Sequence, residues 1–141
     1  MLTSKKTILR GATLIFAVLL SVSLLAPVAQ ARASAYIFSY AISVCPDGNG
    51  KVSAWFDVSG TGTMEELGTK TITIYENGTA VKSFSYLSTP SMMAYNTAFH
   101  YGSVSYDGVK GKSYYAIATF WAAKQGGGDS RTKQSATIVA T

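Results

Sequence analysis

Apolar and polar residues alternate along most of the chain after residue 35, and this alternation constrains the fold more than any other feature. A period of two places successive side chains on opposite faces of a strand, whereas an amphipathic helix needs a period of 3.6 residues, which no stretch of this region sustains. Turn-forming pairs such as Asn77 and Gly78 separate the alternating runs. Seven strands are predicted, over residues 36–44, 51–59, 69–76, 79–86, 98–106, 113–122 and 131–140.

Seven short strands separated by turns are typical of a single antiparallel β-sandwich of the immunoglobulin or fibronectin type III kind. We assign this all-β domain to residues 36–141, and a small barrel is the alternative architecture. Between the strands, 60–68 is predicted to be a loop with room for one helical turn. Residues 87–97 are predicted to form a longer connection, and 126–129 an open loop.

Residues 1–31 are predicted to be a signal peptide that does not belong to the fold. Three basic residues precede the apolar run 12–26, and Ala29 and Ala31 are small residues at the spacing that signal peptidase recognises. The run is shorter than the roughly 20 residues that a transmembrane helix needs, which disfavours a membrane anchor. The mature protein is therefore expected to be secreted, either released or associated non-covalently with the cell envelope, with no membrane span.

Removal of the signal peptide weakens the case for a nucleic-acid partner. The chain has 12 Lys and Arg against 7 Asp and Glu, a net charge of +5. Lys5, Lys6 and Arg10 lie in the signal peptide, so the mature chain has a net charge of about +2. A nearly neutral protein lacks the strong basic patch that binds phosphate backbones, and we expect no nucleic-acid partner.

The residues that carry chemistry in proteins are few in this chain. One His and one Cys cannot supply the ligands of a zinc site, and no metal or cofactor is predicted. His100 is expected to be structural or at the surface, because no Gly-x-Ser-x-Gly turn presents a serine to it. Glu65 and Glu66 are adjacent and are expected to be solvated rather than a catalytic pair. No catalytic residue is assigned, and the chain is predicted not to be an enzyme.

Cys45 is the single cysteine, so it cannot form a disulfide within the chain. We expect its side chain to be buried as a small hydrophobic group. The alternative is an exposed thiol that links two chains.

A candidate binding face is predicted on the outer side of the sheet. It follows if the inward-facing residues are Ile72, Ile74, Ala116, Ala118, Phe120, Ala136 and Ile138. Alternation then places Tyr75, Tyr115 and Trp121 outside, together with Arg131 and Lys133. Such a face can stack on sugar rings or contact a protein, although half-exposed strands select the same residue types without any ligand. The sequence leaves open which face of strand 113–122 is buried.

Residues 111–122 resemble the sixth strand of fibronectin type III domains, which has the order Gly-x-x-Tyr-x-apolar-x-apolar-x-Ala. The resemblance implies that Tyr114 is a structural tyrosine corner, whose hydroxyl bonds to nearby backbone. The whole chain also resembles a group of uncharacterised small secreted proteins of Gram-positive bacteria. The shared segments are 60–64, 70–76, 100–102 and 111–116. This second resemblance implies fold and export, and it implies no activity.

Together these features predict a small exported interaction module without enzymatic activity, whose partner is a protein or a cell-envelope glycan. The alternative is a carbohydrate or cell-wall binding module that uses the aromatic sheet face. A secreted hydrolase or inhibitor, and a subunit that polymerises by adding strands at a sheet edge, are further alternatives.

Overall fold

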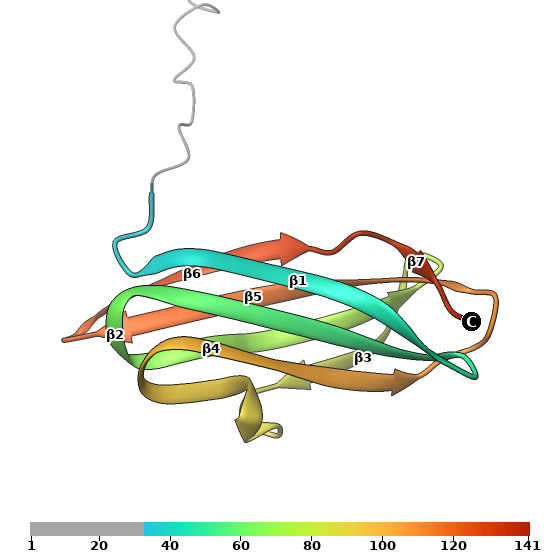
Figure 1. Cartoon of the computed structure of the whole chain (residues 1–141), viewed down its shortest axis with the longest axis horizontal. Coiled ribbons are helices and arrows are strands. Elements are labelled where there is room, and N and C mark those ends of the chain that lie inside the picture. The colour runs from blue at the N-terminus through green and yellow to red at the C-terminus, as the bar shows by residue number, and fades with distance from the viewer. Residues whose placement is uncertain (1–32) are drawn as a thin grey trace, which may run out of the picture. The chain divides into compact units, whose positions relative to one another are not determined.

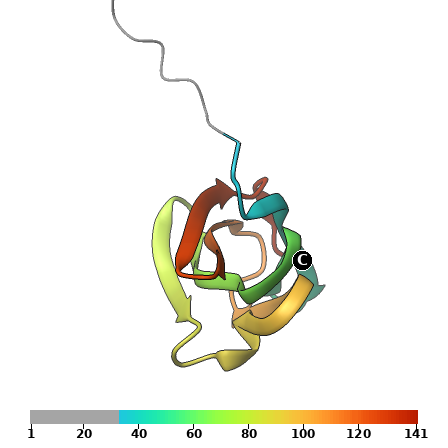
Figure 2. The same ribbon diagram turned by 90° about the vertical axis from the view of Figure 1, so that its left-hand side faces the viewer.

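Within residues 33–141, seven antiparallel strands belong to one strongly curled sheet that resembles half of a barrel (Figures 1 and 2). The computed structural model describes residues 33–141, and the predicted signal peptide lies outside them. The strands are β1 (Ile37–Gly48), β2 (Lys51–Glu76), β3 (Thr79–Ser85), β4 (Met93–Asp107), β5 (Ser113–Lys124), β6 (Gly127–Gln134) and β7 (Ile138–Val139). A short 3-10 helix, η1 (Pro90–Met92), precedes β4. Among the described residues, no helix is long and apolar enough to cross a membrane.

The strand β2 is the reason that the strands form one sheet instead of two separate ones. Residues 60–68, predicted to be a loop, continue the strand, so that β2 is 26 residues long. Its first half pairs with β1 on one side and β4 on the other. The pairing with β4 continues to Gly68, and the second half of β2 also pairs with β5 and β3. The register against β4 shifts between Ser59 and Met64, and such an irregularity bends a strand. The bend carries β2 from one half of the curled sheet to the other.

The end of the chain also differs from the predicted strands. Residues 126–129 do not form an open loop, because Gln125 and Gly126 make a tight turn with positive φ and β6 begins at Gly127. The predicted strand 131–140 is divided into β6 and β7. Ser135 interrupts it, because its hydroxyl accepts a hydrogen bond from the Ala116 amide at 2.9 Å.

The hydrophobic core fills the inside of the curl. It contains five of the residues expected there: Ile72, Ile74, Ala116, Ala118 and Phe120. The same side of β5 buries Tyr114 and Ala122, which settles the face of this strand that the sequence left open. Ala136 is exposed, because Ser135 takes the inward position in its place.

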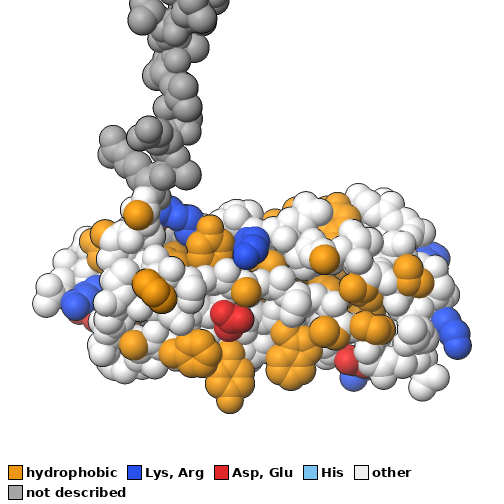
Figure 3. All heavy atoms as spheres, turned by 45° about the horizontal axis from the view of Figure 1, so that its top comes forward, with side chains coloured by type: hydrophobic (Ala, Val, Ile, Leu, Met, Phe, Trp, Pro, Cys, Tyr) orange, Lys and Arg blue, Asp and Glu red, His pale blue; other side chains and the backbone are white. Residues whose placement is uncertain are grey.

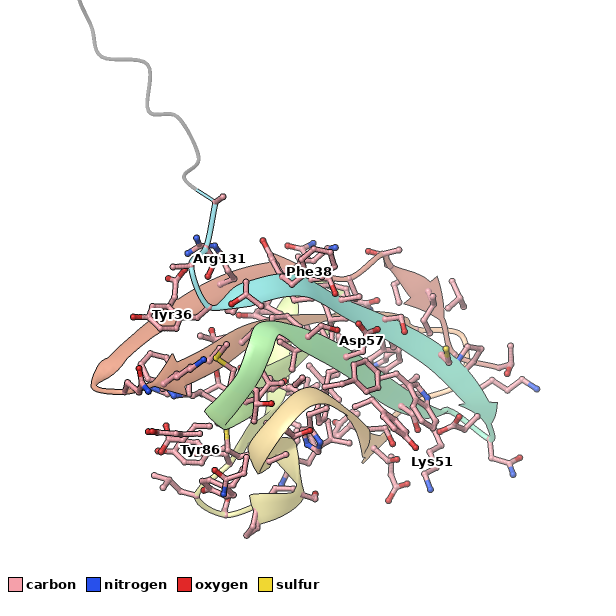
Figure 4. All side chains as sticks on the ribbon, turned by 60° about the vertical axis from the view of Figure 1, so that its left-hand side comes forward. Tyr36, Phe38, Lys51, Asp57, Tyr86 and Arg131 are labelled. Atoms are coloured by element: carbon pink, nitrogen blue, oxygen red, sulfur yellow. The ribbon has the colours of Figure 1, made fainter. Side chains whose placement is uncertain are left out.

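The first strand departs from simple alternation at Phe38. The pairing of β1 with β2 shifts between Ile37 and Ser39, which is the mark of a β-bulge. Ile37 is therefore buried, and the side chain of Phe38 is 79% exposed on the outside of β1 (Figure 4).

Candidate functional site

Two tyrosines of the predicted face lie side by side on the outer surface of the sheet. Tyr75 of β2 is the direct cross-strand partner of Tyr115 of β5. Their rings are stacked, with centroids 4.8 Å apart and planes 7° apart. Both rings are half-buried, so the pair offers a firm aromatic surface.

Trp121 lies on the same outer face of β5, and its neighbours fix the orientation of its ring. The indole Nε1 donates a hydrogen bond to Glu66 Oε2 at 2.7 Å. The Lys70 ammonium lies 3.5 Å from the ring centroid, within the range of a cation–π interaction. The ring also lies against the β6 backbone, because a Cβ added at Gly128 would be 2.6 Å from it. The half-buried Trp121 ring is therefore held in place before any ligand binds.

A groove of about 560 Å³ runs beside Trp121 at the end of the sheet that carries the β5–β6 turn. Tyr95 of β4 forms part of its lining and is 60% exposed. The other lining residues are Glu65, Glu66, Asn96, Ala123, Lys124, Gly126, Gly127 and Gly128. The groove is shallow and open, and its lining combines aromatic rings with carboxylate acceptors. This combination suits a ligand with flat apolar faces and hydroxyl donors.

Arg131 and Lys133 do not share this outer face, contrary to expectation. They pair with Phe120 and Ala118, both of which point into the core, so they lie on the inner side of the edge strand β6. The outer positions belong to residues such as Thr132, whose hydroxyl lies 3.2 Å from that of Thr119. The cause is the short β5–β6 turn, which sets a register one residue away from the assumed one.

Arg131 and Lys133 have contacts of their own near the edge. Arg131 forms an ion pair with Asp129 at 2.8 Å. A hydrogen bond with Ser34 and the charge of Arg131 lower the pKa of the Asp129 carboxyl. Lys133 Nζ reaches the Tyr40 carbonyl of β1 at 3.4 Å. Both cations therefore connect β6 to nearby parts of the chain.

The remaining candidates occupy structural or solvated positions. His100 Nε2 lies 2.8 Å from the Ser91 carbonyl, and its ring packs 5.5 Å from that of Phe56. Glu65 and Glu66 belong to β2 and are exposed. Cys45 is exposed, contrary to the expected burial, because alternation in β1 turns it outward next to the buried Val44. Within residues 33–141, no three His, Cys, Asp or Glu side chains are grouped closely enough to hold a metal ion.

A second aromatic surface was missed in the sequence. Trp55, Phe99 and Tyr101 lie on the outer face of the first half of β2 and of β4, and they are 47%, 52% and 65% exposed. The rings of Phe99 and Tyr101 are 5.7 Å apart. Figure 3 shows hydrophobic rings that stand out along the lower margin of one face of the molecule. The signal was the alternation in 98–106, where the inward positions hold His100 and Val104 and leave both aromatics outside.

Tyr114 lies at the corner between β4 and β5 and is completely buried. Its hydroxyl accepts a hydrogen bond from the Val109 amide at 2.7 Å and donates one to Glu76 Oε2 at 2.5 Å. Lys112 Nζ donates to the other oxygen of Glu76 at 3.0 Å. Burial and the bond to Glu76 raise the pKa of the Tyr114 hydroxyl. The cluster ties β2 to the β4–β5 connection.

The contribution of Glu76 to stability is expected to disappear in acid. Hydrogen bonds from Tyr114 and Lys112 lower the pKa of its carboxyl from the ordinary value of 4.5. The contribution is therefore present above about pH 4.5 and is lost as the pH falls through the lower folded-state pKa. In thermal melts over this acid range, Glu76→Gln should show a smaller fall in Tm than the wild type. Glu65→Gln, at an exposed carboxylate, is the control, and an equal flattening in both variants would contradict the prediction.

Comparison of the chain with protein-family models, with curated proteins and with solved structures finds no match. The support for a function therefore comes from the surfaces described above.

Proposed function

We propose that the mature chain is a non-catalytic interaction module that works outside the cell or in the cell envelope. It binds its partner on the outer face of the sheet, at the groove beside Trp121. The observation that carries the proposal is the fixed Trp121 ring, held by Glu66 and Lys70 next to the exposed ring of Tyr95. Rigid aromatic side chains that line a groove often contribute most of the binding energy of an interface.

A carbohydrate or cell-wall ligand is the second candidate for the same groove. Sugar rings present flat C–H faces that stack on aromatic rings, and their hydroxyls donate hydrogen bonds to carboxylates. The groove provides both, through Trp121 and Tyr95 on one hand and Glu65 and Glu66 on the other. Glu66 already accepts the indole hydrogen bond, and its carboxylate has further acceptor sites.

Other observations support the remaining parts of the proposal. The ring of His100 is engaged with Ser91 and Phe56, which supports a structural role in place of catalysis. The bond between Tyr114 and the Val109 amide supports kinship with fibronectin type III or immunoglobulin-like sandwiches, which we also propose. The proposal that the protein is exported depends on the signal peptide predicted for residues 1–31.

Trp121→Ala is expected to weaken partner binding about 30-fold or more, because truncation of an aromatic anchor costs about 2 kcal/mol or more. The measurement is sedimentation of the purified protein with washed Gram-positive cells, isolated peptidoglycan and insoluble polysaccharides. The matched control is Trp55→Ala, which removes the exposed tryptophan on the other half of the sheet and leaves the groove intact.

Comparison of binding to cells, peptidoglycan and polysaccharides distinguishes a protein partner from a glycan ligand. Binding to peptidoglycan or polysaccharide that Trp121→Ala removes supports the glycan, and binding to cells that prior protease treatment removes supports a protein partner. Loss of binding in Trp55→Ala to the same extent as in Trp121→Ala would contradict a site in the groove. Absence of binding to every target would contradict a cell-envelope partner.

A further inference from the structure

The strand β4 has a free edge on the side away from β2. Within residues 33–141, β4 pairs with β2 alone, and Figure 1 shows it along the lower margin of the sheet. The amide and carbonyl of Phe99 both bond to Thr97 Oγ1, at 3.3 and 3.0 Å, so they point away from β2. In an antiparallel strand every second residue repeats this direction. The backbone groups of Tyr101, Ser103 and Ser105 therefore also point outward.

This edge lacks the features that keep exposed strands apart. Charged residues, prolines and short strands protect natural sheet edges from pairing with other chains. The β6 edge carries Arg131 and Lys133, and Lys133 also covers the Tyr40 carbonyl of β1. The β3 strand has only seven residues and contains Lys82. Between Met93 and Tyr106, in contrast, β4 has no Lys, Arg, Asp, Glu or Pro.

Two aromatic side chains at this edge are exposed. They belong to Phe99 and Tyr101, whose backbone groups point outward, and the exposed Trp55 of β2 lies opposite Ser103. An uncharged edge with a row of exposed rings is a surface from which water is readily removed. Other extended segments fit such an edge, but a second copy of the same strand has a particular advantage.

We propose that β4 pairs with β4 of a second copy, antiparallel, about a two-fold axis close to Gly102. Two identical strands related in this way match donors with acceptors automatically, because each outward amide faces an outward carbonyl of its partner. The segment Phe99–Ser105 is centred on Gly102, and no like charges on β4 face each other across the axis. On pairing, Thr97 Oγ1 gives up its bonds to the Phe99 amide and carbonyl, which then face Ser105 of the partner. In this register Tyr101 lies opposite Ser103 of the partner and Phe99 lies opposite Ser105, so the two Tyr101 rings become diagonal neighbours across the seam and lose part of their exposure. The two curled sheets join into one continuous sheet.

The pairing is tested by sedimentation velocity over a wide range of protein concentration. The sample is the protein recovered after expression of the full sequence. We expect a monomer–dimer equilibrium. Tyr101→Lys should raise its dissociation constant about tenfold or more, because it places like charges on the two paired strands. Ser103→Pro should have a similar effect, because it removes an outward amide and leaves the aromatic rings in place. The control is Thr132→Lys on β6, which should leave the equilibrium unchanged.

Hydrogen exchange on the unmodified protein provides a test that needs no variant. The amides of Tyr101, Ser103 and Ser105 should become protected as the concentration rises through the dimerisation range. A protein that stays monomeric would overturn the proposal, as would a dimer in which these amides stay unprotected. An equal effect of Thr132→Lys would also overturn it. Binding at the Trp121 groove involves other residues, so this result and the sedimentation with cells can fail independently.

Discussion

Gly68→Val is expected to leave the protein largely unfolded. A Cβ at Gly68 would lie 2.3 Å from the Met92 carbonyl oxygen and 2.7 Å from the Met93 Cα, both of which are backbone atoms. Gly68 pairs with Met93 of β4 on one side and with Trp121 of β5 on the other, so the strand cannot move aside. Overpacking costs about 1–3 kcal/mol where flexible side chains can adjust, and a clash with backbone costs more.

Urea denaturation of Gly68→Val and of the control Gly62→Val measures this effect. A Cβ at Gly62 meets no atom within 4 Å, and this position also belongs to β2. The control should therefore retain nearly the stability of the wild type. Equal midpoints for the two variants would show that β2 does not press against the η1–β4 junction as described.

Tyr114→Phe is expected to lower the free energy of unfolding by about 2–3 kcal/mol, although it removes a single oxygen atom. The variant removes the hydroxyl that accepts from the Val109 amide and donates to Glu76 Oε2, and it leaves the carboxylate with the hydrogen bond from Lys112 alone. The loss of a partner for a charged group costs more than that for a neutral one.

The control for Tyr114→Phe is Tyr106→Phe. The Tyr106 ring packs near that of Tyr114, with centroids 6.2 Å apart, and its side chain is half-buried. Chemical denaturation near neutral pH should show a large shift for Tyr114→Phe and a small one for Tyr106→Phe. A difference of less than about 0.5 kcal/mol between the two variants would mean that the corner hydrogen bonds contribute little.

Alternation in the sequence predicts the strands well where one face is buried and the other is polar. It places Ile72, Ile74 and Phe120 in the core, and it identifies the β2–β3 turn at Asn77 and Gly78. It does not predict that residues 60–68 continue β2. Three glycines, several polar residues and a register shift obscure the pattern there, and only pairing with β4 and β5 extends the strand through this segment.

The candidate site is predictable in part for a related reason. Tyr115 and Trp121 lie on the outer face because β5 alternates regularly, and Tyr75 lies there as the direct cross-strand partner of Tyr115. Arg131 and Lys133 were assigned to the wrong face, because the position of a turn of two residues decides the orientation of every side chain that follows it. The contacts of Trp121 with Glu66 and Lys70 join residues far apart in the sequence, and no local pattern contains them.

The strand β2 takes part in both halves of the curled sheet, and this has a consequence for how the protein unfolds. Opening of one half disturbs the other, because β2 and β4 both continue from one half of the sheet into the other. Thermal and chemical unfolding should therefore be two-state, without a half-folded intermediate that exposes the core. Because β2 also pairs with β5, which lies far along the sequence, the chain must close a long loop before the curl can form. We therefore expect refolding to be cooperative and slower than that of a helical protein of equal length.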